Sequence, residues 1–396
     1  MSENVIIAGV GMVPFKKPGQ SESYDVMGSK AAANALQDAG LNYMDIEHAF
    51  AGYVYGDSCS GQTALYRLGM TGIPVVNVNN NCASGTTAFH LAAQAVKFGM
   101  AECVMAVGFE QMDPGALDLV FSTKTSPLAR HLDAVTELMG LSAEERALPP
   151  AVMMFGCQCE LLTARYGVAE TSLAEIRVKA HRHAATNPNA IFRNPVSVED
   201  VLQGNPIYRG LRKMFACPPS CGAASVIVCS ESFARQHGIR ADIRLIGTGA
   251  GSDRAEFFQS DPLDVMFRGL SRDAAQKAYE DAGVGPKDID VIELHDCFTS
   301  NEAITYTALG LCAEDEIERF ILDGDNTYGG QVVIGPSGGL LAKGHPLGAT
   351  GLAQITELVW HLRGSAGARQ VEGARTALQH NGGLGSAGFV NILQRE

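Results

Sequence analysis

The sequence contains an internal repeat, which restricts the possible folds more than any other feature does. Residues 32–58 read AANALQDAGLNYMDIEHAFAGYVYGDS, and residues 274–300 read AAQKAYEDAGVGPKDIDVIELHDCFTS. Both segments predict a helix that ends at a glycine, followed by a short loop and a strand. An apolar strand with a Gly-rich turn precedes each of them, NVIIAGVGMVPF in the first and ADIRLIGTGAGSD in the second. The chain is therefore predicted to consist of two related halves with βαβ units.

The second parts of the two halves also correspond. NCASGTTAFHLAAQAV aligns with GHPLGATGLAQITELV, so that Cys82 falls on His345 and Gly85 on Gly348. A strand over residues 74–78, which we expect to be buried, precedes Cys82. Both segments open helices of small and aliphatic residues, a composition typical of helices covered on all sides. A pseudo-twofold axis would bring Cys82 and His345 to facing helix N-termini, although a duplication without chemistry at these points would give the same repeat.

We expect the halves to span residues 1–240 and 241–396. A stretch from about 113 to 220 has no counterpart in the second half, and we interpret it as an inserted loop or lid region. Its basic residues suit a ligand that carries phosphates, with an ordinary solvated face as the alternative. They include Lys124, Arg130, Arg165, Arg177, Lys179, Arg182, Arg193, Arg209, Arg212 and Lys213.

The composition argues against several classes of protein. A net charge of −13 is unfavourable for nucleic-acid binding, which needs a basic face. Ten cysteines in 396 residues do not form the disulfide framework of a small secreted protein. The N-terminus is not a signal peptide, no apolar window could span a membrane, and the last residues, NILQRE, lack a peroxisomal address. We expect a soluble cytoplasmic protein, peroxisomal only if its source is eukaryotic.

Cys82 and His345 have the residue types and positions of a nucleophile and its base. A thiol reacts as the thiolate, and a helix N-terminus or a nearby imidazole lowers its pKa. Ser84 and Gly85 leave the backbone N–H groups after Cys82 accessible, so these amides can also hold an oxyanion. His345 lies in GGLLAKGHPLGATG, where Pro346 fixes the first helical turn. Inert packing of the cysteine and a structural role of the histidine are the alternatives.

Two further motifs lie in the second half. IELHDCFTSNEA places His295 and Cys297 at a strand end, where α/β proteins display active groups, and Cys297 is a candidate second acid/base. ALQHNGGLGSAG places His380, Asn381 and Gly382 in a Gly-rich turn that can aim an N–H into a pocket, unless this is ordinary turn chemistry. His-x-Cys can be half of a zinc site, but no second Cys/His pair has convincing spacing, so we expect no metal.

The motifs NNNCASG, HDCF, GGLLAKGHPLGATG and LQHNGGLG resemble, in order and spacing, the thiolase superfamily, and most closely its sterol-carrier type. The resemblance extends over essentially the whole chain. It implies a five-layer α-β-α-β-α fold of two duplicated halves with an inserted loop domain, and a homodimer or a dimer of dimers. Thiolases of the sterol-carrier type have a lipid-transfer domain after the thiolase part. This chain stops at its final strand, so we expect no such domain.

The resemblance also implies roles for the nucleophile and its surroundings. Cys82 would be the nucleophile, and His345 would activate it and help to hold one thioester oxygen. The amides of Cys82 and Gly382 would form a second oxyanion hole. Cys217 falls near the position that contacts the pantetheine of CoA in the family.

A departure from the ordinary family pattern concerns the acid/base. Ordinary thiolases have a catalytic Cys-x-Gly motif where this chain has His380 and Asn381 before a glycine. The acid/base thiol is therefore expected at Cys297, as in the sterol-carrier type. His295 would steady that thiolate or hold the water of the first oxyanion hole, and His380 is the rival acid/base.

The reaction that the resemblance implies is CoA-dependent cleavage of a 3-ketoacyl-CoA, as in fatty-acid β-oxidation. It uses CoA as co-substrate and no tightly bound cofactor, and leaves open whether the acyl chain is straight, branched or part of a steroid. The alternatives are an acyl-CoA or lipid-binding protein without thiolysis, a thiolase-fold retro-aldolase and a condensing enzyme.

Overall fold

The computed structural model describes residues 3–114 and 123–396. Part of the predicted insertion, residues 115–122, lies outside the described residues. No helix in the described ranges has both the length and the apolar character that crossing a bilayer requires.

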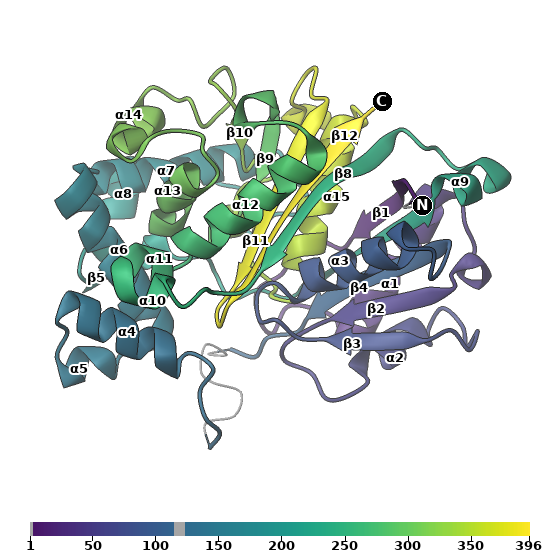
Figure 1. The fold of residues 1–396 in the computed structure, drawn as a ribbon, viewed down its shortest axis with the longest axis horizontal. Coiled ribbons are helices and arrows are strands. Elements are labelled where there is room, and N and C mark those ends of the chain that lie inside the picture. The colour runs from purple at the N-terminus through teal and green to yellow at the C-terminus, as the bar shows by residue number, and fades with distance from the viewer. Residues whose placement is uncertain (1–2, 115–122) are drawn as a thin grey trace.

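The centre of the molecule is a ten-stranded sheet that consists of two halves of five strands (Figure 1). The order is β3-β2-β4-β7-β1 in the first half and β10-β9-β11-β12-β8 in the second. In both, the three outer strands are parallel and the next two run antiparallel to their neighbours. The halves meet at β1 and β8, through the pairs Val5–Leu245 and Ile6–Arg244. Order and direction thus repeat, and the predicted duplication is confirmed.

The ten strands have the following bounds: β1 Val5–Met12, β2 His48–Gly52, β3 Val75–Val78, β4 Cys103–Glu110, β7 Gly222–Ser230, β8 Ile243–Gly251, β9 Val291–Glu293, β10 Val333–Ile334, β11 Thr376–Gly383 and β12 Ala387–Arg395. The boundary that we expect at residue 240 lies between α9 (Glu231–His237) and β8.

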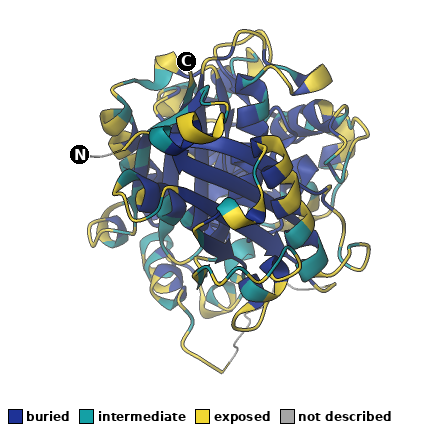
Figure 2. Cartoon of the chain, turned by 90° about the vertical axis from the view of Figure 1, so that its right-hand side faces the viewer, coloured by how far each residue is buried: buried dark blue, intermediate teal, exposed yellow. Residues whose placement is uncertain are grey.

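Helices form three layers around the two half-sheets. α3 (Ser84–Lys97) and α15 (Thr350–Leu362) pack against each other and against strands of both halves, in one shared apolar core. α1 (Tyr24–Ala39) covers the other face of the first half, and α12 (Arg268–Ala282) that of the second. Figure 2 shows the strands as buried and the exposed residues on outer helices and loops. The predicted five-layer arrangement is therefore present.

The predicted insertion is largely helical and gathers at one end of the molecule, on the left of Figure 1. It comprises α4 Ala129–Met139, α5 Ala143–Arg146, α6 Pro150–Tyr166, α7 Glu170–Ala184, α8 Val198–Leu202, the hairpin β5 Pro206–Tyr208 with β6 Leu211–Arg212, and η2 Lys213–Phe215. The remaining helices are η1 Tyr43–Asp45, α2 Ser60–Leu65, α10 Phe257–Ser260, α11 Pro262–Val265, η3 Pro286–Asp288, α13 Thr299–Ala308, η4 Glu314–Glu316, α14 Ile317–Leu322, η5 Gly339–Lys343 and η6 Gly367–Arg369.

The strand before Cys82 is not buried, contrary to our expectation. β3 is the edge strand of the first half, and Val76 is 40% exposed. Its apolar run resembles that of an interior strand, but β2 alone pairs with it among the described residues. An edge strand keeps a row of backbone N–H and C=O groups available for another chain.

Three glycines allow the two central helices to begin close together. A Cβ on Gly85 or Gly108 would lie 2.4 or 2.1 Å from the carbonyl oxygen of Gly348. A Cβ on Gly348 would lie 2.4 Å from the carbonyl oxygen of Phe109. The alignment of Gly85 with Gly348 in the repeat therefore reflects a close backbone approach at the junction of the halves.

Replacing Gly108 by alanine should destabilise the protein by about 1–3 kcal/mol or more, because the new methyl group would overlap a backbone oxygen that cannot move aside. Gly285→Ala is the matched control, since its Cβ would meet nothing closer than 3.8 Å. Urea unfolding followed by circular dichroism measures both variants. Equal stabilities would show that the junction can relax.

Candidate active site

Three of the predicted site residues come together where the central helices begin. The sulfur of Cys82 and one ring nitrogen each of His295 and His345 lie within 4.8 Å of one another, and all three side chains are buried. Cys82 precedes α3, His345 lies between η5 and α15, and His295 follows β9. The two halves of the chain therefore contribute jointly to one site.

The asparagines before Cys82 build the turn that places it at the start of α3. Asn81 has a left-handed backbone with φ of 52°, a conformation that Asn tolerates better than most residues. The Ser84 hydroxyl accepts from the Asn80 N–H at 2.9 Å and donates to the Asn81 carbonyl oxygen at 2.7 Å. The side chain of Asn80 donates to the Thr87 hydroxyl at 3.0 Å. The position of the thiol is thus fixed by local side-chain hydrogen bonds.

The thiol of Cys82 is shielded from solvent. Cys82 is 8% exposed, and burial raises its pKa to about 12, against the opposing effect of a hydrogen bond from the backbone N–H of Leu384. The Asn81 side chain donates to the Leu384 carbonyl oxygen at 3.2 Å and so holds this loop beside the thiol. At neutral pH the group is a thiol, and it needs a base in order to react.

His345 offers such a base. Its Nδ1 lies 2.8 Å from the Thr350 hydroxyl, and that hydroxyl donates its proton to the Pro346 carbonyl oxygen at 2.9 Å. Nδ1 must therefore be the donor, which leaves Nε2 with a free lone pair. Nε2 is buried and has no hydrogen-bond partner in the described part of the chain. Burial lowers the His345 pKa to about 3, so the ring is neutral and able to accept a proton.

Alkylation of Cys82 by iodoacetamide should accelerate about tenfold per pH unit from about pH 7 to about pH 10, because only the thiolate reacts and its pKa is raised to about 12. His345, with a pKa of about 3, should add no step in this range. The rate is measured by mass spectrometry of the Cys82 peptide, since Cys59 is exposed and reacts as well. A plateau below about pH 9 would indicate a preformed thiolate–imidazolium pair instead.

The HDCF motif lies directly beside this pair. The His295 ring stands edge-on to that of His345, with centroids 5.1 Å apart, and its Nδ1 lies 2.9 Å from the Asn381 amide nitrogen. The Asp296 carboxylate accepts from the backbone N–H groups of Leu340 and Leu341 at 2.8 and 3.2 Å. Asp296 therefore ties this motif to the loop that presents His345.

The thiols of Cys297 and Cys217 lie near that of Cys82, close enough for a charge on one to raise the pKa of another. Cys297 is 6% exposed, and burial raises its pKa well above the usual range, as do the charges that Cys217 and Cys82 would carry as thiolates. The N–H of Cys217 donates to the Cys297 carbonyl oxygen at 2.9 Å. A second protonated thiol is thus available close to the nucleophile.

Strand alternation separates the residues of the final motif. Gln379 and Asn381 face the central helices, whereas the Nε2 of His380 lies 2.9 Å from the Ser271 hydroxyl on α12, on the other face. The Nδ1 of His380 accepts from the His295 backbone N–H at 3.4 Å, so both of its ring nitrogens are engaged. All three predicted site residues of this motif lie within β11 and not in the Gly-rich turn that we expected, and Gly382 pairs with Gly388 in the β11–β12 ladder.

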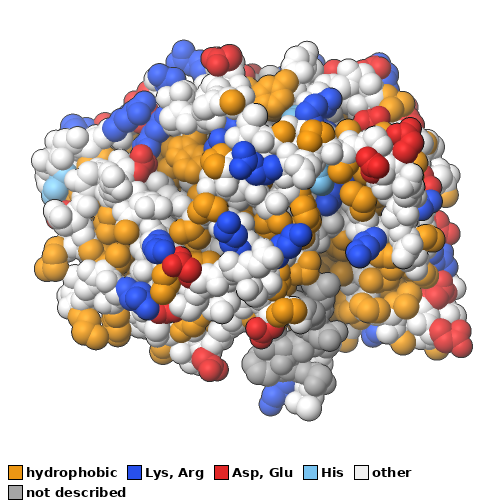
Figure 3. Space-filling view, turned by 180° about the vertical axis from the view of Figure 1, so that it is seen from behind, with side chains coloured by type: hydrophobic (Ala, Val, Ile, Leu, Met, Phe, Trp, Pro, Cys, Tyr) orange, Lys and Arg blue, Asp and Glu red, His pale blue; other side chains and the backbone are white. Residues whose placement is uncertain are grey.

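Most basic residues of the insertion interact within the protein. Five form ion pairs with acidic side chains of the protein, namely Arg146, Arg165, Lys179, Arg209 and Arg212. Arg177 is 4% exposed and donates to the Ala216 carbonyl oxygen. Figure 3 shows Lys and Arg side chains spread over one face of the molecule and not gathered in a patch. Among the rest, Arg182 lines a cleft of about 400 Å³ together with Arg369.

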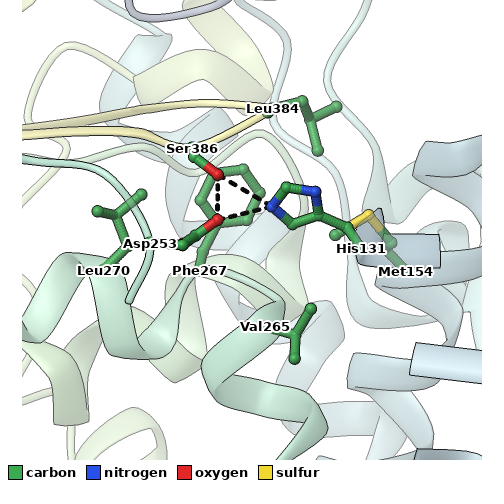
Figure 4. A pocket seen from close by; sticks show the side chains of 9 residues that line it. His131, Met154, Asp253, Val265, Phe267, Leu270, Leu384 and Ser386 are labelled. Atoms are coloured by element: carbon green, nitrogen blue, oxygen red, sulfur yellow. Dashed lines mark hydrogen bonds and ion pairs between the residues drawn. The ribbon is translucent and has the colours of Figure 1, made fainter. Parts of the chain in front are cut away.

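A small cavity of about 10 Å³, room for about one water molecule, adjoins the site (Figure 4). Leu384 and Phe267 line it, and the Phe267 ring lies 6.3 Å from that of His295. One wall carries His131, whose Nε2 lies 2.6 Å from Asp253 and 3.0 Å from Ser386. These residue types occur in hydrolase triads, but both oxygens contact the same ring nitrogen, so His131 cannot relay a proton between them.

The residues that orient the candidate catalytic groups were missed by sequence reasoning. Thr350 fixes the tautomer of His345, and the Ser220 hydroxyl accepts a hydrogen bond from the backbone N–H of His345 at 3.0 Å. The Glu110 carboxylate accepts from the N–H of Gly348 at 3.0 Å, and burial raises its pKa to about 7. The hydroxyl in GHPLGAT was a usable signal for Thr350, but nothing in the local sequence marks the other two.

Comparisons with known proteins cover both halves of the chain. The family described as "Thiolase, N-terminal domain" matches residues 5–206, and "Thiolase C-terminal domain-like" matches residues 249–395. "Sterol carrier protein 2" of Oryctolagus cuniculus is 46% identical over 98% of this chain and 72% of its own length. "Benzoylsuccinyl-CoA thiolase subunit BbsB" of Thauera aromatica is 33% identical over 97% of this chain and 96% of its own length.

Solved structures share the fold. The "Ltp2-ChsH2(DUF35) aldolase" superposes with a TM-score of 0.81 at 23% identity, over 100% of this chain and 98% of that one. The human mitochondrial 3-ketoacyl-CoA thiolase in complex with CoA superposes with a TM-score of 0.72 at 18% identity, over 100% and 98%. An aldolase and a thiolase thus have this architecture, and the side chains of the site must decide between such activities.

Proposed function

The chain belongs to the thiolase family and is an acyltransferase of that family, and we propose that it cleaves 3-ketoacyl-CoA with CoA through an acyl-enzyme on Cys82. The observation that carries this proposal is the unpartnered Nε2 lone pair of His345 in the same buried cluster as the Cys82 thiol. A retro-aldol or lipid-binding site needs no such pair.

The cleavage half-reaction proceeds as follows. His345 Nε2 takes the proton of Cys82, and the sulfur forms a bond to the 3-keto carbon of the substrate. The C2–C3 bond then breaks, which leaves the acyl group on Cys82 and the enolate of a shorter acyl-CoA, acetyl-CoA or propionyl-CoA. Cys297 gives its proton to the α-carbon of this enolate, a role that suits a thiol kept protonated by burial.

The transfer half-reaction restores the protons. The Cys297 thiolate takes the proton of incoming CoA, and the CoA sulfur attacks the thioester on Cys82. Cys82 leaves as thiolate and recovers its proton from His345. Removing one donor to the oxygens that become negative typically costs about 3 kcal/mol of barrier, so the groups around His295 should contribute substantially to the rate as well.

The substrate and the assembly are parts of the same proposal. The acyl chain would enter between Leu384 and Phe267, which must move apart because the cavity there has a volume of only about 10 Å³, and the pantetheine would pass Cys217. The CoA phosphates would lie against basic side chains of the insertion that have no acidic partner, with Arg182 as the first candidate. The open edge of β3 would pair with a second copy to give a homodimer or a dimer of dimers.

The proposed function is tested by incubating the protein with a panel of 3-ketoacyl-CoAs, straight and branched, with and without CoA. The expected result is CoA-dependent loss of the 3-ketoacyl-CoA absorbance, with an acyl-CoA shortened by two or three carbons as product. Binding without turnover would support a lipid carrier. CoA-independent release of a ketone or aldehyde would support a retro-aldolase, and either result would overturn the proposal.

A further inference from the structure

A row of polar side chains lies in the core behind His295. Its members come from the central helices and from β11 and β12, and each is 0% exposed: Thr86, Gln354, Gln379, Asn381 and Asn391. Buried amides and hydroxyls cost free energy unless they are hydrogen-bonded, and neighbouring members of this row are 2.7 to 3.0 Å apart. If the donor and acceptor at one end of such a network are fixed, the direction of every hydrogen bond along it is fixed as well.

One end is fixed by backbone carbonyl groups. The Nε2 of Gln354 lies 2.8 Å from the carbonyl oxygen of Leu294 and 3.2 Å from that of His380. Carbonyl oxygens only accept, so the amide NH₂ of Gln354 must face them. Its Oε1 therefore accepts from Gln379 Nε2 at 2.8 Å, and the same NH₂ of Gln379 donates to the Thr86 hydroxyl at 3.0 Å.

The direction continues to the imidazole. The Thr86 hydroxyl accepts from Gln379 and donates its only proton to Asn381 Oδ1 at 3.0 Å. Asn381 consequently presents its NH₂ to His295 Nδ1 at 2.9 Å. Burial and the nearby His345 and His380 lower the His295 pKa well below its usual value, so this ring is neutral. A neutral ring whose Nδ1 accepts carries its proton on Nε2.

We propose that Gln354, Gln379, Thr86 and Asn381, together called the amide relay, are positioning residues that hold His295 in its Nε2–H tautomer. His295 then donates a hydrogen bond to an oxygen of the substrate and does not act as a base. His345, which Thr350 holds in the opposite tautomer, keeps the lone pair that accepts the proton of Cys82. Two adjacent histidines are thus assigned opposite tasks by their partners; the identity of the substrate oxygen rests on the proposed function.

The amide relay also bears on metal binding. Cys82, His295 and His345 offer sulfur and nitrogen atoms within 4.8 Å of one another, the kind of cluster that binds zinc. A ring nitrogen that carries a proton has no lone pair for a metal, so the Nε2–H of His295 opposes binding. To bind Zn²⁺, the His295 proton must move to Nδ1 and the Asn381 amide must turn over, against the hydroxyl of Thr86.

The first test needs no substitution in the relay. Long-range ¹H–¹⁵N spectra of the protein labelled with ¹⁵N-histidine distinguish protonated from unprotonated ring nitrogens, and His295→Gln and His345→Gln assign the signals. The expected result at neutral pH, without substrate, is Nε2–H for His295 and Nδ1–H for His345. Nδ1–H on His295 would overturn the inference. This measurement does not involve turnover, so its failure is distinct from failure of the proposed thiolase activity.

The second test removes the hydroxyl of the relay. Thr86→Val lacks the hydroxyl that donates to Asn381 Oδ1. Turning the Asn381 amide over therefore breaks no hydrogen bond at this position, and His295 should show both tautomers. A net hydrogen bond is worth about 1 kcal/mol, so Zn²⁺ should inactivate this variant at about fivefold lower concentration than it inactivates the wild type. Thr86→Ser keeps the hydroxyl and should behave as the wild type in both measurements. An unchanged tautomer and unchanged Zn²⁺ sensitivity in Thr86→Val would contradict the inference.

Discussion

Replacing Cys82 by alanine should abolish thiolysis, with a loss on the order of 10⁴- to 10⁶-fold in kcat, because Cys82 carries the acyl chain in the proposed reaction. The helix start that holds Cys82 is fixed by Asn80, Asn81 and Ser84, so the fold should persist. The variant should show the circular dichroism spectrum of the wild type and less than about 2 kcal/mol loss in urea unfolding.

Cys229→Ala is a suitable control for this variant. Cys229 is a buried free cysteine in β7, it lies opposite Cys103 in the sheet, and it belongs to the apolar core beneath α1 that includes Ala35. We expect nearly full activity from it. Thiolysis by Cys82→Ala within tenfold of the control would show that the nucleophile is a different group.

Replacing Cys297 by alanine should slow turnover by about 100- to 10,000-fold, the usual contribution of a general acid–base group. Acylation of Cys82 by a simple acyl-CoA should be affected much less, because that step creates no carbanion. The measurement is exchange of the α-protons of acetyl-CoA in heavy water, which requires the acid/base alone.

His380→Ala is the matched comparison for Cys297→Ala. Both ring nitrogens of His380 are hydrogen-bonded, one to the His295 backbone and one to Ser271 on α12, so we expect α-proton exchange to survive in His380→Ala. Survival of exchange in Cys297→Ala together with its loss in His380→Ala would assign the acid/base to His380 instead.

The repeat made the fold accessible from the sequence. Duplicated segments must form duplicated elements, and the alignment of Gly85 with Gly348 marks a contact that only glycine permits. The exposure of β3 was not predictable, because the sequence of an edge strand does not state which strands lie beside it. The ion pairs of Arg209 and Arg212 with glutamates likewise result from tertiary packing. The sequence therefore made the insertion look more basic than its surface is.

The candidate site could be predicted in part. Helix N-termini and strand ends pointed to Cys82, His345 and Cys297, because these positions follow from local structure. The tautomers of the histidines could not be predicted, since they depend on hydrogen bonds from distant segments, such as that of Asn381 to His295. Strand alternation in LQHNGG could have indicated that His380 and Asn381 face opposite sides of the sheet.

The acyl-enzyme itself is the most direct test of the account. The protein is mixed with a 3-ketoacyl-CoA in the absence of free CoA, quenched in acid, digested and analysed by mass spectrometry. The account predicts an acyl group shorter by two or three carbons on the peptide that contains Cys82, and its release when CoA is added before the quench. An acyl group on Cys297 or Cys217 would contradict it, and so would cleavage of the substrate without an acyl group on any cysteine.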